Sequence, residues 1–208
     1  MFLLIGVVGS GIMAQRLSPT DVGLQLLQNA MATAGVLVAV ITIFGTISAD
    51  VNPAVTLGAW ALGHRAGREV GPMLVVQVSG GCVGTVIANL MFDLPPIVLS
   101  TTTRSAGHLW LGEAVATVGL LLVVFSLIRT GRSSALPYAV ASYIGAAYYF
   151  TSSTGFANPA VTVARTLSDT FTGIRPSSAP MFIGMQVAGV LIAVVLLRAL
   201  FPSQASTT

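Results

Sequence analysis

The sequence predicts an all-α membrane protein, and its composition, its apolar runs and a repeated motif carry that prediction. Of the 208 residues, 54% are hydrophobic and 7% are charged, whereas a soluble domain carries about 25% charged residues. The mean hydropathy of +0.90 points the same way. Long apolar runs favour helices over the short alternating segments of a membrane β-barrel. This composition excludes a soluble enzyme, a disordered tail and a collagen-like fibre.

Apolar runs define the helices that we expect to lie in the membrane. A helix needs about 20 residues to cross the hydrocarbon core of a bilayer. The runs expected to span it are residues 22–45, 71–92, 109–128, 136–150 with their flanks, and 180–201. One further run, residues 1–14, is too short to cross without tilting, and it lacks the basic start of a signal peptide. We interpret it as a first helix that is truncated or that begins at a late start codon.

The motif Asn-Pro-Ala-Val-Thr begins at Asn52 and again at Asn158. Each copy interrupts an apolar segment, 47–63 or 154–169, that fits neither a span nor an ordinary loop. We therefore expect a single membrane domain over residues 1–208, with repeat one at about 1–93 and repeat two at about 108–201. Three spans per repeat is an odd number, so the second repeat starts on the opposite side of the membrane. Such inverted repeats place their functional site at the midplane.

Asparagine caps helix N-termini and proline favours the first helical position, so each motif predicts a helix that starts inside the membrane. Two such half-helices, inverted by the repeat, would meet with their N-termini at the bilayer centre, each carrying about half a positive charge. Their field repels cations and admits neutral molecules, and the asparagine amides can donate hydrogen bonds to a passing oxygen atom. One copy would be an ordinary helix cap, but two matched copies indicate a pore. The expected pore residues are Asn52, Pro53, Ala54, Asn158, Pro159 and Ala160.

The two matched motifs resemble those of the major intrinsic protein family, the aquaporins and aquaglyceroporins, and the resemblance runs from about residue 5 to residue 201. It implies an aquaporin-like inverted repeat of 3+3 transmembrane helices with two re-entrant half-helices. It also implies a homotetramer in a bacterial cell membrane, in which each protomer has its own pore for water or small neutral solutes. We expect no cofactor, metal site, nucleic-acid partner or enzyme activity, because the sequence carries no Ser-His-Asp set, phosphate loop or metal motif.

The resemblance also implies a four-residue selectivity filter beside the motifs. Counting from the two motif asparagines places it at Ala32, Ala146, Gly155 and Val161. The family usually has arginine where this chain has Val161, so we expect a wide, apolar constriction that favours glycerol-like or uncharged metalloid solutes. Residues 156–165 resemble a bacterial subgroup that is linked to uncharged arsenic compounds.

Ionisable residues near the expected pore allow more than one interpretation. Arg165 lies one helical turn beyond Val161, and its guanidinium either reaches the pore mouth and partly replaces the missing arginine or pairs with Asp169. Asp50 precedes the first motif, where it either stabilises the helix N-terminus or attracts cations into the vestibule. Glu113 lies inside a span, and the resemblance implies that it binds the backbone of a re-entrant loop. Its counterpart in repeat one would fall upstream of the first residue of the chain.

A passive channel for neutral solutes is the function that these features predict. A secondary transporter, which also uses inverted repeats and broken helices, is the alternative, although only Glu113 and Asp50 could hold a coupling ion. A non-conducting, truncated family member is a further alternative, because the first helix is short.

Overall fold

The computed structural model describes residues 1–201 apart from residues 46, 48 and 49. The described residues form α-helices and short 3-10 turns without a β-strand, which confirms the predicted class. The helices are α1 (Phe2–Leu17), α2 (Val22–Phe44), α3 (Pro53–Ala61), α4 (Gly67–Met91), α5 (Gly107–Arg129), α6 (Leu136–Phe150), α7 (Pro159–Ala164) and α8 (Ala179–Leu200). The 3-10 turns are Ser133–Ala135 before α6, Arg165–Leu167 after α7 and Pro176–Ser178 before α8.

Within the described residues, four helices are long and apolar enough to cross a membrane, namely α2, α4, α5, and α8 together with the turn before it. α1 and α6 are shorter, with 16 and 15 residues. The sequence predicts a spanning helix at residues 136–150, and α6 has these bounds but is shorter than a full span. α1 continues to Leu17, beyond its predicted end at residue 14, so the first helix is no shorter than α6.

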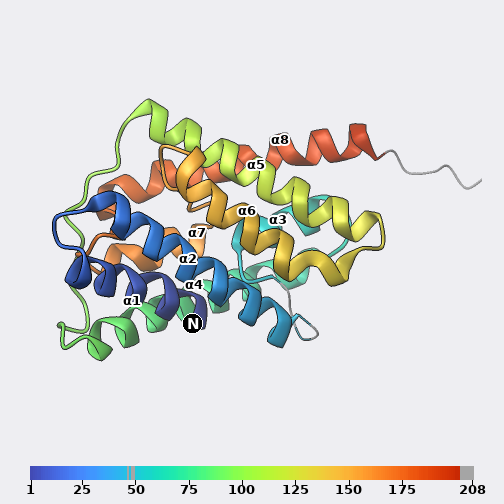
Figure 1. The fold of residues 1–208 in the computed structure, drawn as a ribbon. Helices are drawn as coiled ribbons and strands as arrows, with labels where there is room; N and C mark the ends of the chain where they lie inside the picture. The colour runs from blue at the N-terminus through green and yellow to red at the C-terminus, as the bar shows by residue number, and fades with distance from the viewer. Residues whose placement is uncertain (46, 48–49, 202–208) are drawn as a thin grey trace, which may run out of the picture.

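The two repeats interlock around the half-helices α3 and α7. α1 packs against α2 and α4, α5 packs against α6 and α8, and the contact between α2 and α6 joins the two groups. α7 packs mainly against α4, and α3 packs against α8 and α4. Figure 1 shows α3 and α7 in the middle of the molecule, with α5 and α8 on one side and α1 and α4 on the other. Each half-helix is therefore held partly by a long helix of the other repeat.

Small residues let α5 and α8 approach closely, as is common between helices in membranes. A Cβ atom at Gly189 of α8 would lie 2.8 Å from the Cβ of Thr117 and 2.9 Å from the carbonyl oxygen of Ala114, both on α5. A larger residue at 189 would push the two helices apart. This close approach brings Gln186 of α8 within hydrogen-bond reach of Glu113 on α5.

Candidate pore

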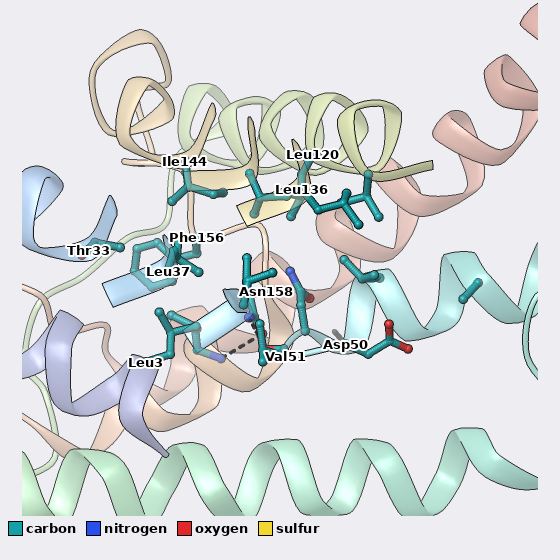
Figure 2. Close-up of a pocket in the computed structure, with 18 of the residues that line it drawn as sticks. Leu3, Thr33, Leu37, Asp50, Val51, Leu120, Leu136, Ile144, Phe156 and Asn158 are labelled. Carbon is teal, nitrogen blue, oxygen red and sulfur yellow. Dashed lines mark hydrogen bonds between the residues drawn. The ribbon is translucent and has the colours of Figure 1, made fainter. Parts of the chain in front are cut away.

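A cavity of about 270 Å³ lies between the two repeats, and helices from both line it. Figure 2 shows Thr33 on one side of Asn158 and Asp50 on the other. We call these sides the α7 end and the α3 end. The α7 end is formed by Thr33, Tyr148, Phe156 and Arg165, and the α3 end by Asp50, His64 and Arg65. The cavity has room for several water molecules, each of which occupies about 30 Å³ in the liquid.

The motif asparagines cap the two half-helices. The Oδ1 atom of Asn52 accepts from the backbone N–H of Ala54 at 2.8 Å. The Oδ1 atom of Asn158 accepts from the N–H groups of Ala160 and Val161 at 3.0 and 3.2 Å. The prolines that follow occupy the first helical position, as their fixed φ favours. The remaining motif residues, Pro53, Ala54, Pro159 and Ala160, are buried behind the cavity wall and do not line it.

The same two asparagines also connect the repeats to each other. The Nδ2 atom of Asn52 donates to the carbonyl of Ala157 at 2.7 Å, and the Nδ2 atom of Asn158 donates to the carbonyl of Val51 at 3.1 Å. Both side chains line the cavity, where their exposed fractions are 5% and 4%. An amide nitrogen carries two N–H groups, so each asparagine keeps one donor for a molecule in the cavity. The two helix N-termini thus converge on one place.

Glu113 holds the segment that leads into α7. Its carboxylate, which is fully buried, accepts from the N–H groups of Phe156 and Ala157 at 2.9 and 3.0 Å. Gln186 donates to the same carboxylate and to the hydroxyl of Thr162. Ala157 has a positive φ of 47°, in the left-handed region that an alanine rarely adopts. These bonds stabilise that conformation and fit the supporting role that the resemblance implies for Glu113.

The segment that leads into α3 has a weaker support. Gln77 donates to the hydroxyl of Thr56 at 3.0 Å and to the backbone carbonyl of Asp50, and so takes the place that Gln186 has in repeat two. The N–H groups of Asp50 and Val51 have no hydrogen-bond partner within the described part of the chain. A second cavity, of about 490 Å³, lies beside these two residues near the first turn of α1. Among the described residues, no carboxylate accepts from these two N–H groups as Glu113 does from those of Phe156 and Ala157.

The helix positions of the expected filter lie elsewhere than counted. Gly155 and Val161 line the cavity, but Ala32 and Ala146 are exposed on the outer faces of α2 and α6. Their places are taken by Thr33 and Tyr148, whose hydroxyl groups lie 3.0 Å apart in a hydrogen bond. Neighbouring residues on a helix point about 100° apart, so a count that is off by one or two residues selects the wrong face. The expected pair of alanines is wrong, because a tyrosine and a threonine occupy the wall.

Arg165 lies in the cavity wall at the α7 end. Its side chain is only 2% exposed, its Nε donates to the carbonyl of Thr172, and its guanidinium carbon lies 3.5 Å from the ring centroid of Phe156. Its two terminal nitrogens have no protein partner among the described residues. The expected pairing with Asp169 is wrong, because that carboxylate accepts from the N–H and hydroxyl of Thr101 instead. Arg165 therefore retains free donors beside the cavity.

Arg104, from the loop between α4 and α5, is a second cation near the α7 end. Its Nε donates to the carbonyl of Gly173 at 3.0 Å, and its guanidinium lies 5.1 Å from the ring centroid of Phe156. Burial lowers the pKa of Arg104 from its usual value, but a guanidinium stays protonated in proteins. Phe156 thus lies near two cations, and the sequence had no motif that pointed to this cluster.

Asp50 at the α3 end is paired. Its Oδ2 atom lies 2.7 Å from one terminal nitrogen of Arg65. The other terminal nitrogen of Arg65 lies 3.2 Å from the carboxylate of Glu69. The expectation that Asp50 attracts cations loses its basis, because the charge is compensated. Arg65 is a cavity residue that the sequence did not point to.

Comparisons with known proteins agree with this geometry. The family model described as "Major intrinsic protein" matches residues 1–152. The chain belongs to the major intrinsic protein family. It is 44% identical over 197 residues to the aquaglyceroporin AqpS of Rhizobium meliloti (strain 1021), covering 94% of this chain and 84% of that protein. It is 32% identical over 111 residues to the probable aquaporin AqpM of Archaeoglobus fulgidus, covering 50% and 45%.

The fold is also found among solved structures. The aquaglyceroporin from Plasmodium falciparum is similar with a TM-score of 0.72 and 18% identity, over 97% of this chain and 93% of that one. At this identity the likeness concerns the fold, which is the predicted aquaporin-like one. Family membership makes the chain a passive membrane channel for water and small neutral solutes, and not an enzyme. It leaves the secondary transporter without support.

Proposed function

We propose that the cavity is the permeation path of this channel, and that it passes neutral solutes of glycerol size and uncharged metalloid hydroxides as well as water. The observation that carries this proposal is Arg165, which stands with free donors in the wall beside Val161. The relative AqpS, an aquaglyceroporin, supports a solute wider than water.

The middle of the cavity suits an uncharged permeant. Asn52 and Asn158 bring the N-termini of α3 and α7 together there, and each N-terminus contributes about half a positive charge. A cation would meet like charge after losing much of its hydration, so its entry is unfavourable. A neutral hydroxyl oxygen can accept from the free N–H of either asparagine.

The α7 end suits a solute with several hydroxyl groups. Arg165 offers its terminal nitrogens, and Thr33 and Tyr148 add hydroxyl groups. Val161 and Gly155 contribute neither a donor nor much bulk, so they leave space for carbon atoms of the solute. A polyol can place its hydroxyls on the polar side of this wall and its carbon chain on the other. The channel can therefore select solutes without an arginine at position 161, because Arg165, one helical turn later, supplies the hydrogen-bond donors.

Stopped-flow swelling of proteoliposomes with water, glycerol, urea and an arsenic or antimony trihydroxide tests the proposal. Water and glycerol should enter at rates proportional to their gradients and independent of Na⁺ or proton gradients. Arg165→Met keeps a long side chain but removes the charge, so methylammonium leak should rise severalfold. Arg16→Met is the matched control, because Arg16 lies at the end of α1 and does not line the cavity.

Three results would contradict this proposal. Glycerol flux that requires an ion gradient would restore the secondary transporter. If methylammonium leak is equal in Arg165→Met and the wild type, Arg165 does not contribute to the exclusion of cations. A wild-type protein that inserts but passes neither water nor glycerol would favour the non-conducting family member.

We also propose that the protein is a homotetramer in the inner membrane of a bacterium. A single chain lines the cavity, so each protomer would carry its own path. α4 exposes large apolar side chains, among them Val75 and Val76 at 67% and 69%, which suit lipid or a neighbouring protomer. Native mass spectrometry from lipid particles should give a four-chain species, and a monomer in lipid would contradict this proposal.

A further inference from the structure

The loop between α3 and α4 reaches two walls of the cavity at the α3 end. The ring of His64 stacks on Phe125 of α5, with ring centroids 6.0 Å apart and an angle of 9° between the planes. The next residue, Arg65, lies 2.7 Å from the carboxylate of Asp50 on the other side. All four residues line the cavity. Since His64 contacts α5 and Arg65 contacts the segment before α3, the loop borders this end of the cavity.

The pair of Asp50 and Arg65 is held in place from both sides. The hydroxyl of Thr56 donates to the Asp50 carboxylate at 3.5 Å, and Gln77 donates to the Asp50 backbone carbonyl. Glu69 contacts Arg65 from the first turn of α4 at 3.2 Å. The side chains of Asp50 and Arg65 are 13% and 22% exposed, so most of their surface is shielded from water. A charge-assisted contact of this kind is short and directional, and it fixes where the guanidinium sits.

We propose that the Asp50–Arg65 ion pair is a second selection point of the pore, which limits solute size at the α3 end and keeps this end electrically neutral. The neighbouring cavity wall is apolar and includes Val124, Ile128 and Leu136, so the pair is the principal polar group that a solute meets there. The bulk of the guanidinium limits which solutes pass. The Asp50 carboxylate offsets its charge within the cavity wall, because Glu69, the second carboxylate on Arg65, does not line the cavity.

The proposal rests on the channel function but not on the selecting role of Arg165, since the two groups lie at opposite ends of the cavity. Each residue of the pair has a distinct part. Removing Arg65 takes away bulk and leaves Asp50 uncompensated. Removing the charge of Asp50 keeps the volume of both residues but leaves the guanidinium held by Glu69 alone, on the side away from Asp50. Both changes should relax size selection, and they should not add up, because each one breaks the same contact.

Proteoliposome swelling with water, glycerol and sorbitol tests this inference on the full-length protein. In Arg65→Ala the permeability ratio of sorbitol to water should rise roughly fivefold or more, as expected when a barrier falls by about 1 kcal/mol. Asp50→Asn should raise the same ratio in the same direction. The double variant should show less than the product of the two effects. Water permeability normalises each measurement for the amount of inserted, folded channel.

Arg68→Ala is the matched control. Arg68 is exposed in the first turn of α4, makes no ion pair with the described residues and does not line the cavity, so its variant should keep the wild-type ratio. An unchanged sorbitol-to-water ratio in Arg65→Ala would overturn the proposal. If Arg65→Ala does not insert, an unchanged ratio in Asp50→Asn overturns it equally. A wild-type channel that conducts water but not glycerol would contradict the proposed function and leave this ratio test intact.

Discussion

Val161 is the residue at which the α7 end can be narrowed most directly. Its side chain lines the cavity one helical turn before Arg165 and is 6% exposed. Val161→Arg would add a long cation with five donors beside an existing cation. Glycerol permeability should fall by roughly tenfold or more, which corresponds to about 1.4 kcal/mol of barrier, while water should slow less. Stopped-flow swelling of vesicles measures both rates.

Ala146→Val controls for added bulk outside the cavity. Ala146 is exposed on α6, whereas Tyr148 of the same helix faces the cavity. The control should keep wild-type glycerol permeability. Unchanged glycerol flux in Val161→Arg would show that residue 161 does not line the constriction.

The wall residues also show how much of the site could be predicted from the sequence. The motif fixed Asn52, Asn158 and Val161, because a helix that starts at a known proline has a known register. The positions on α2 and α6 could not be counted in the same way, because the intervening loops set the register and their geometry is not visible in the sequence. A usable signal was present in the spacing of four residues that places side chains on one helix face. The cavity-lining face of α6 has this spacing: Leu136, Val140, Ile144 and Tyr148.

At the level of elements, the starts of both half-helices could be predicted, whereas only α3 has a recognisable signal at its end. Both begin at the expected prolines, Pro53 and Pro159. After α3 the chain turns at Gly63, which has a positive φ of 80° and is a recognisable stop signal. No glycine follows α7, which tightens into a 3-10 turn at Arg165. The contact of Arg165 with Thr172 belongs to the folded loop, so no local pattern could predict it.

The support of α7 by α5 and α8 gives a prediction about stability. Glu113→Gln leaves one oxygen where two accepted, so at least one buried N–H or amide group loses its acceptor. Each such group costs about 1–3 kcal/mol, and in a chain of this size a loss of 1 kcal/mol lowers Tm by about 2–4 °C. Thermal unfolding in detergent, followed by fluorescence, should show this drop together with reduced glycerol flux.

Glu69→Gln is the control for the same chemical change at an exposed site. Its side chain is 47% exposed, and exposed ion pairs contribute up to about 1 kcal/mol. Its Tm should fall less than that of Glu113→Gln. Equal falls would mean that the Glu113 carboxylate does not hold the segment before α7.

At the level of the whole molecule, the repeats are alike in the middle and different at the ends. Asn52 and Asn158 make matching caps and matching bonds to the opposite segment. Away from the middle Gln77 and Gln186 still match, but Glu113 supports only one segment and Arg65 covers only one end of the cavity. This division fits the functions that we propose. The shared centre excludes charged species, the α3 end selects solutes by size, and the α7 end selects them by hydrogen bonding.

The central field yields a prediction for both repeats at once. Asn52→Asp and Asn158→Asp keep the oxygen that caps each half-helix, but each replaces an amide donor with a negative charge where the two positive helix ends meet. Proton and methylammonium leak should rise in both single variants and more in the double variant, while water flux changes less. Asn89→Asp is the control, because Asn89 is equally buried but does not line the cavity. If the leak rises equally in the control, the effect comes from a loosened structure, and the two half-helices do not set the charge barrier.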